Sequence, residues 1–268
     1  MAQAGPRSAS NLPKEFGYGC VDSDILKNNE ARRENVCCFD LEDERSPSFL
    51  TKIEELMSNR SFHKIVLMAT VYRAALGGNV VFLGMGAQVI LSGLPDTVHL
   101  QAVRFLSERA KAIAEVQKIP YPQALSLVNK MDAGKKAFLS HYFDANINEP
   151  TLYHLTINAS CVSLEHALDL TSRYCQLHFS SEGSLRLQTA LRCRLLEKRA
   201  EILLFRLGMV HAMGKIEFQA TGEGVLSVKG IIGGEHEKEK LLEALERLEE
   251  VNKVEDHMRV GVLSRIVY

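Results

Sequence analysis

Short apolar runs separated by helical segments constrain the fold of this 268-residue chain most strongly. Residues 79–84 (NVVFLG), 97–103 (TVHLQAV) and 151–158 (TLYHLTIN) are rich in β-branched residues, as is typical of strands. The segments between and after these runs carry apolar residues at helical spacing. Strands that alternate with helices predict an α/β fold with a parallel sheet.

The last third of the chain has a different pattern. Residues 185–213 form a long helical stretch, and two alternating segments around the turn at 222–224 fit a β-hairpin. An amphipathic helix at 235–251 and a final strand at 258–268 follow. Residues 180–184 (SSEGS) are typical of a linker. The order helix, strand, strand, helix, strand predicts a separate, small α+β domain.

These patterns divide the chain into three parts. Residues 1–15 are rich in small and polar types and contain two prolines, so we expect a disordered N-terminus. Residues 16–180 form the predicted α/β domain, and residues 181–268 form the linker helix and the α+β domain.

Composition excludes several classes of function. Lys and Arg number 32 against 33 Asp and Glu, so we expect no nucleic-acid partner held by bulk charge. The chain lacks both a signal-peptide pattern and an apolar run of about 18 residues, which predicts a cytoplasmic protein. Its six cysteines form no C-x-x-C pair and its histidines lack ligand spacing, so we predict no metal site.

A glycine turn follows the first of the predicted strands. Gly84 and Gly86 flank Met85 in the segment NVVFLGMGAQVIL. Glycine turns between a strand and a helix often hold phosphates, but Met85 offers a phosphate neither charge nor a useful hydrogen bond. We interpret the turn as the remnant of a phosphate-handling site, with plain core packing of Met85 as the alternative.

Four stretches carry a resemblance to a known family. They are FGYGCVDSDIL (16–26), NVVFLGMGAQVIL (79–91), ERAKAIAE (108–115) and the long segment from MDAGKKAF to HALDL (131–170). Over residues 16–172 the chain resembles the cytidylate-kinase-like family, a branch of the P-loop nucleoside monophosphate kinases. The resemblance implies a parallel, three-layer kinase-like sheet with flanking helices. It also implies CMP as the acceptor, with ATP and Mg²⁺ if the chain is an active kinase.

The residues that should carry the chemistry depart from the family pattern. The family's G-R-G-A reads Gly84-Met85-Gly86-Ala87, and its D-x-x-R begins at Asp132 and has Lys135 in place of arginine. The resemblance therefore implies a remnant nucleotide-binding site without a catalytic residue, at Asp22, Gly84, Met85, Gly86, Asp132, Lys135 and Asn158. For Lys135 and Lys136 the alternative is a solvated helix face. Arg104 and Arg109, on the helix after the second strand, could reach an anion, with surface ion pairs as the alternative.

The donor-phosphate loop is not recognisable. The motif G-x-x-x-x-G-K-[ST] is expected before residue 16, where the chain reads GPRSASNLPKE. Pro13 stands where the helix of the loop would run, and proline there costs about 3 kcal/mol. Two hypotheses follow. The chain is a degenerate nucleotide-binding protein acting as a sensor or scaffold, or it is an active CMP kinase whose P-loop portion is missing by truncation.

A second resemblance covers residues 190–262. The segment VLSVKGIIGGEHEKEKLLEALERLEEVNKVEDHMRV is similar to a BON domain. This resemblance implies attachment to a phospholipid or a small ligand, so we expect a lipid or protein partner for residues 190–262. The apolar residues of the helix at 185–213 indicate packing between domains or a homo-oligomer.

Overall fold

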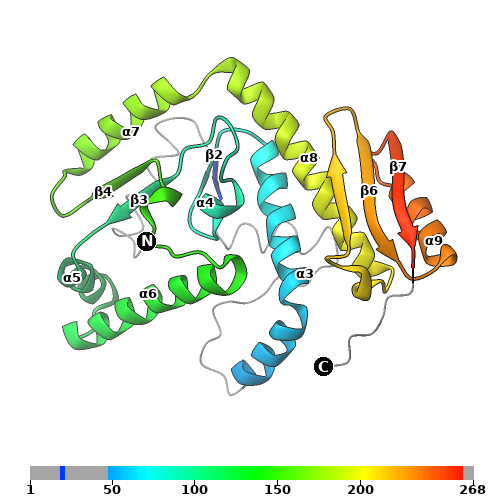
Figure 1. Ribbon diagram of the computed structural model, residues 1–268. Helices are drawn as coiled ribbons and strands as arrows, with labels where there is room; N and C mark the ends of the chain where they lie inside the picture. The colour runs from blue at the N-terminus through cyan, green and yellow to red at the C-terminus, as the bar shows by residue number, and fades with distance from the viewer. Residues whose placement is uncertain (1–18, 22–47, 262–268) are drawn as a thin grey trace. The chain divides into compact units, whose positions relative to one another are not determined.

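The computed structural model describes residues 19–21 and 48–261, which form a mixed α/β structure (Figure 1). Within these residues the chain separates into two compact units. Unit 1 contains described residues 19–21 and 77–187, and unit 2 contains residues 48–76 and 188–261. None of the described helices combines the length and the apolar character needed to cross a lipid bilayer.

Unit 1 is built from short parallel strands and longer helices. Its elements are β1 (Gly19–Val21), β2 (Val80–Phe82), α4 (Ala87–Ile90), β3 (Leu100–Val103), α5 (Leu106–Gln117), α6 (Tyr121–Phe143), β4 (Leu155–Asn158) and α7 (Leu164–His178). Strand β1 pairs with β2, and β3 pairs with β4, both in parallel (Figure 1). The predicted parallel pairing is thus confirmed. The described strands form two separate pairs, so a single kinase-like sheet is not seen.

Unit 2 contains a three-stranded mixed sheet with helices. Its elements are α3 (Ser48–Leu76), the part of α8 (Ser181–Arg206) from residue 188 onward, β5 (Ile216–Ala220), β6 (Val225–Ile232), α9 (Glu235–Glu246) and β7 (Lys253–Val260). Central strand β6 runs antiparallel to β5 and parallel to β7. The predicted order helix, strand, strand, helix, strand is confirmed for these elements.

The last strand begins earlier than predicted. The parallel register pairs Val225 with Lys253 and Ile232 with Val260, so β7 uses the whole length of β6. The prediction of a strand from residue 258 was wrong at its start, because the charged residues at 253–257 do not form an apolar run. Residues 262–268 of that predicted strand lie outside the described part of the chain.

The predicted linker at residues 180–184 was also wrong, because helix α8 already begins at Ser181. Gly183 lies inside the first turn of this helix, and a Cβ atom there would collide with the carboxylate of Asp96. That carboxylate accepts a hydrogen bond from the backbone N–H of Ser180 at 2.9 Å. The glycine therefore permits a close approach within unit 1 and does not mark a flexible connection.

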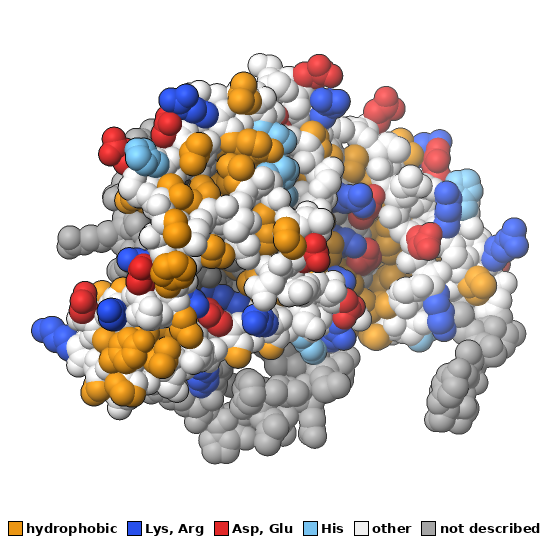
Figure 2. Space-filling view, turned by 60° about the vertical axis from the view of Figure 1, so that its left-hand side comes forward, with side chains coloured by type: hydrophobic (Ala, Val, Ile, Leu, Met, Phe, Trp, Pro, Cys, Tyr) orange, Lys and Arg blue, Asp and Glu red, His pale blue; other side chains and the backbone are white. Residues whose placement is uncertain are grey.

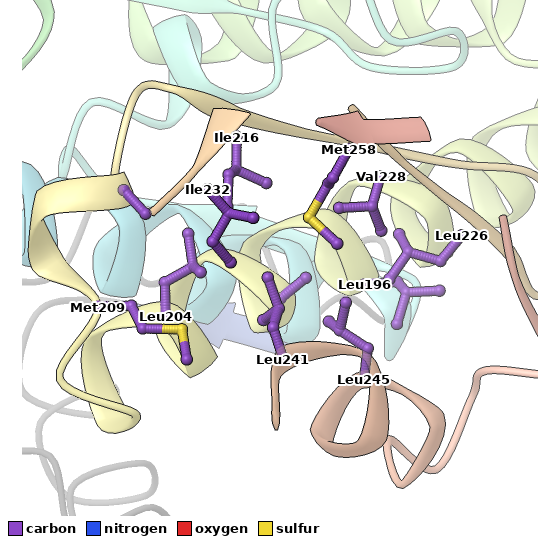
Figure 3. Close-up of a cluster of buried hydrophobic side chains, with 12 residues drawn as sticks. Leu196, Leu204, Met209, Ile216, Leu226, Val228, Ile232, Leu241, Leu245 and Met258 are labelled. Atoms are coloured by element: carbon purple, nitrogen blue, oxygen red, sulfur yellow. The ribbon is translucent and has the colours of Figure 1, made fainter. Parts of the chain in front are cut away.

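The core of unit 2 lies between the sheet and its helices. One face of the sheet presents alternating apolar residues, as in Leu226 and Val228 of β6, to α8 and α9 (Figure 3). The buried cluster consists of Leu196, Ala200, Leu204, Met209, Ala212, Ile216, Leu226, Val228, Ile232, Leu241, Leu245 and Met258. Each large side chain buried in this way contributes roughly 1.5–3 kcal/mol to folding, so this cluster anchors unit 2.

Candidate functional site

The glycine turn after β2 has an unusual backbone. Gly84, Met85 and Gly86 all have left-handed φ angles, of 81°, 60° and 71°. This region is sparsely populated by residues other than glycine, so Met85 occupies it at some cost. Two constraints favour glycine at position 86: its left-handed φ angle, and the 2.8 Å distance that a Cβ there would have to Cε2 of Phe143 at the end of α6. The turn is thus fixed by its two glycines and packed against α6.

Helix α6 carries charged residues on its buried face. Ala124, Val128, Leu139 and Tyr142 form an inward stripe of buried side chains along this helix. By the 3.6-residue period, positions 132 and 135 fall on the same stripe. Asp132 and Lys135 therefore point into unit 1, where a charged group is costly unless it has a partner.

Asp132 has a strong partner in Arg109 of α5. Nη1 of Arg109 donates to Oδ1 of Asp132 at 2.8 Å, and Nη2 donates to Oδ2 at 2.7 Å. The two side chains are 17% and 32% exposed, so the pair is partly desolvated. Hydrogen bonding from Arg109 holds the pKa of the Asp132 carboxyl below its usual value, with Lys135 adding to the effect. The ion pair expected as an alternative role for Arg109 is confirmed, and it joins α5 to α6.

Lys135 lacks such a partner. Its Nζ atom is buried and has no hydrogen-bond acceptor among the described residues. The Nε atom of Arg109 is also buried and also has no acceptor among them. Arg109, Asp132 and Lys135, which we call the anion site, thus combine two cations with one carboxylate. The neighbouring Lys136 is exposed, so the alternative of a solvated face fits Lys136 but not the buried ammonium group of Lys135.

A second polar cluster lies where β3 and β4 end. Nε of Arg104 and Oγ of Ser160 both donate to Oε2 of Glu108, at 2.8 and 2.9 Å. The backbone N–H of Phe105 donates to Oγ of Ser160. The backbone N–H of Ser160 donates to Oδ1 of Asn158. The hydrogen bonds from Arg104 and Ser160 lower the pKa of Glu108. Glu108 and Ser160 are absent from the predicted residues, although the i,i+4 spacing of Arg104 and Glu108 indicates such a pair.

The predicted site residues fall into two groups. Gly84, Met85 and Gly86 form one turn, in which Gly86 lies against Phe143 of α6, and Asp132 and Lys135 lie on the same helix. Asn158 is separate from them, because its side chain holds the loop after β4 through Ser160. Asp22 lies outside the described residues.

Apolar surface accompanies these polar groups. Val103, Phe105 and Leu106, where β3 leads into α5, are 39%, 53% and 39% exposed. Figure 2, in which the left-hand side of Figure 1 comes forward, shows hydrophobic side chains beside Lys, Arg, Asp and Glu on one face. Among the described residues, no group of three or more His, Cys, Asp or Glu side chains is arranged to hold a metal ion.

Comparison with known proteins decides the family. The sequence pattern of the cytidylate kinase-like family matches residues 2–161. The chain belongs to the cytidylate kinase-like family. A search of curated proteins found no significant match. Among solved structures, an uncharacterized protein from Eubacterium ventriosum ATCC 27560 is 18% identical, with a TM-score of 0.46, over 66% of this chain and 93% of that chain. These comparisons did not match residues 190–262 to a BON domain.

Proposed function

We propose that this cytidylate kinase-like chain binds a phosphate-bearing ligand, a nucleotide such as CMP, at the anion site formed by Arg109, Asp132 and Lys135. One observation carries the proposal: the buried ammonium group of Lys135 has no acceptor among the described residues. A buried cation without a partner is costly, and phosphate oxygens would supply the missing acceptors.

The geometry of the Arg109–Asp132 pair supports this reading. Asp132 occupies both terminal nitrogens of the guanidinium and so fixes the orientation of Arg109. The Nε of Arg109 and the Nζ of Lys135 then remain as donors on the inward side of α6. With one positive charge in excess and side chains that are only partly exposed, the site favours an anion.

In this proposal the protein binds its nucleotide without transferring phosphate. Met85 gives the glycine turn an apolar side chain where the family's arginine could hold a monophosphate, and the donor-phosphate loop is not recognisable in the sequence. Binding without turnover is the behaviour of a sensor or a scaffold.

A matched pair of variants tests the site. Lys135→Met and Lys136→Met remove the same charge from adjacent positions of α6, one buried and one exposed. We expect CMP to raise the melting temperature of the wild type and of Lys136→Met, but not that of Lys135→Met. ATP with Mg²⁺ should raise none of the three melting temperatures. A ligand in hundredfold excess over its Kd adds about 2.7 kcal/mol of apparent stability. Equal responses of both variants, or no response of the wild type, would contradict the proposal.

A second candidate function is CMP phosphorylation with ATP and Mg²⁺. Its favouring observation is that β1 with β2 and β3 with β4 pair in parallel, as the resemblance to nucleoside monophosphate kinases implies. The test is CMP-dependent release of ADP in a coupled assay. Turnover that Asp132→Asn abolishes would favour the kinase, and no turnover would leave binding alone.

For unit 2 we propose an attachment role, as its resemblance to BON domains implies. Support comes from the order of its elements and from its mixed three-stranded sheet. Pelleting of the intact chain with phosphatidylglycerol vesicles and with neutral phosphatidylcholine vesicles tests this role. Failure to pellet with either kind of vesicle would exclude a lipid surface as the partner.

A further inference from the structure

Three imidazoles gather at the amino ends of β3 and β4. His99 and His154 immediately precede these paired strands, and their ring centroids lie 5.1 Å apart. His178, the last residue of α7, meets His154 edge-on at 5.3 Å. Tyr174 stacks on His178 at 5.6 Å. The cluster therefore joins the starts of two strands to the end of a helix.

One hydrogen bond in this cluster needs a neutral imidazole. The backbone N–H of His99 donates to Nδ1 of His154 at 2.9 Å, and the N–H of His154 donates to the carbonyl of His99 at 2.8 Å. Nδ1 accepts only while it carries a lone pair, because both nitrogens of an imidazolium are donors. A proton on Nδ1 of His154 would break this bond and set two N–H groups against each other.

The surroundings offer an added proton no compensating charge. Burial lowers the pKa of His99 to about 4, with the neighbouring His154 acting in the same direction. Burial and then His178 lower the pKa of His154. From the packed helix α7, Tyr174 is a titratable neighbour of His154, and the carboxylate of Asp96 before β3 already accepts a hydrogen bond from Ser180. Within the described chain, no carboxylate forms an ion pair with these three imidazoles.

We propose that His99, His154 and His178 form an acid-sensitive latch, in which proton uptake separates the amino ends of β3 and β4 from each other and from the end of α7. The latch acts without any ligand and is independent of the anion site. It would tie the order of unit 1 to the pH of the surroundings.

The direction and size of the effect follow from proton linkage. In the open state His99 and His154 regain their ordinary pKa of 6.5, so the open state binds more protons than the closed state. The closed state is fully favoured above this value and loses its advantage as the pH falls toward about 4. For His99 alone, the opening equilibrium constant should grow roughly 30-fold between about pH 7.5 and about pH 5.

Amide hydrogen exchange of the intact chain tests the latch. Corrected for intrinsic rates, protection of the His99 and His154 amides should fall roughly 30-fold on acidification to about pH 5, while that of Val228 in β6 holds. Unchanged protection at His99 and His154, or an equal loss at Val228, would overturn the proposal. Both outcomes are read on the wild type and need no variant.

A double variant separates the latch from other acid effects. His99→Asn with His154→Asn keeps a side-chain acceptor near the position of Nδ1 and cannot titrate, so its protection should not respond to pH. His166→Asn, on the exposed side of α7, is the control and should respond like the wild type. Loss of protection in the double variant equal to that of the wild type would also overturn the latch.

Discussion

The two units use their interiors differently. Among the nine largest fully buried side chains of the described chain, eight lie in unit 2 and Val128 alone lies in unit 1. Unit 2 fills its interior with leucine, isoleucine, valine and methionine (Figure 3). Unit 1 places Asp132 and Lys135 on the inward face of its longest helix and leaves Leu100 and Val103 of β3 partly exposed.

This contrast separates stability from chemistry. An all-apolar interior stabilises a fold but offers a ligand no polar contacts. Charged groups that point inward reduce stability but offer a ligand specific contacts. The family match at residues 2–161 covers most of unit 1, which carries the inward charges, and also includes helix α3 of unit 2. We therefore expect variants in unit 2 to change stability, and variants at the anion site to change stability and binding in opposite directions.

The largest effect should come from the core of unit 2. Leu241→Ala should reduce the free energy of unfolding by about 2–5 kcal/mol, because it removes a fully buried side chain and leaves a cavity. Leu177→Ala, at a leucine that is 88% exposed, is the control and should change it by less than about 0.5 kcal/mol. Urea unfolding measures both. Similar losses from the two variants would remove the basis for the comparison.

Asp132→Asn should cost about 2 kcal/mol near neutral pH, because it breaks a partly buried ion pair and leaves Arg109 with an unpaired charge. The pKa of Asp132 is depressed below 3.8, so its stabilising contribution is present above this pH and is lost as pH falls through the folded value. The difference between wild type and variant should be constant near neutrality and shrink below about pH 4. A difference that persists in acid would show that the carboxylate charge is not responsible.

Gly86→Ala should cost about 2 kcal/mol, from a left-handed φ and from contact with Phe143. Gly84→Ala has the same backbone strain but meets no atom within 4 Å, so it should cost about 1 kcal/mol. Thermal unfolding of the two variants compares them directly. Equal losses would mean that the turn does not pack tightly against α6.

The smallest expected effect is an increase in the free energy of unfolding. Lys135→Met should raise the free energy of unfolding by about 1 kcal/mol, because it replaces a buried ammonium group that has no hydrogen-bond acceptor with an apolar side chain. Lys136→Met should change it by less than about 0.5 kcal/mol. If Lys135→Met destabilises the chain, Lys135 contributes to the fold and its inward position does not indicate a ligand.

Sequence patterns predicted the local features of unit 1. The strands before Gly84 and Arg104 were recognisable because β-branched runs and glycine punctuation act over a few residues. The sequence predicted only part of the anion site. Asp132 and Lys135 were predicted from a motif, but Arg109 lies 23 residues before Asp132, and their pairing depends on how α5 packs on α6. No local pattern reports that packing.

Two predictions failed for a common reason. Gly183 lies in a helix, and the charged residues before Met258 form a strand. In both cases a contact distant in sequence overrides local preference: the carboxylate of Asp96 beside Gly183, and the register of β6 along β7. Such contacts are properties of the folded chain and are invisible to a reading of neighbouring residues.

The backbone at Met85 also affects how this chain can evolve. Its left-handed φ of 60° is imposed between two glycines and owes nothing to the methionine side chain. Methionine and arginine are both long and unbranched at Cβ, so either bears the same conformational cost at this position. The tip of the turn can therefore lose or regain a positive charge in one mutational step, without a change in the surrounding fold.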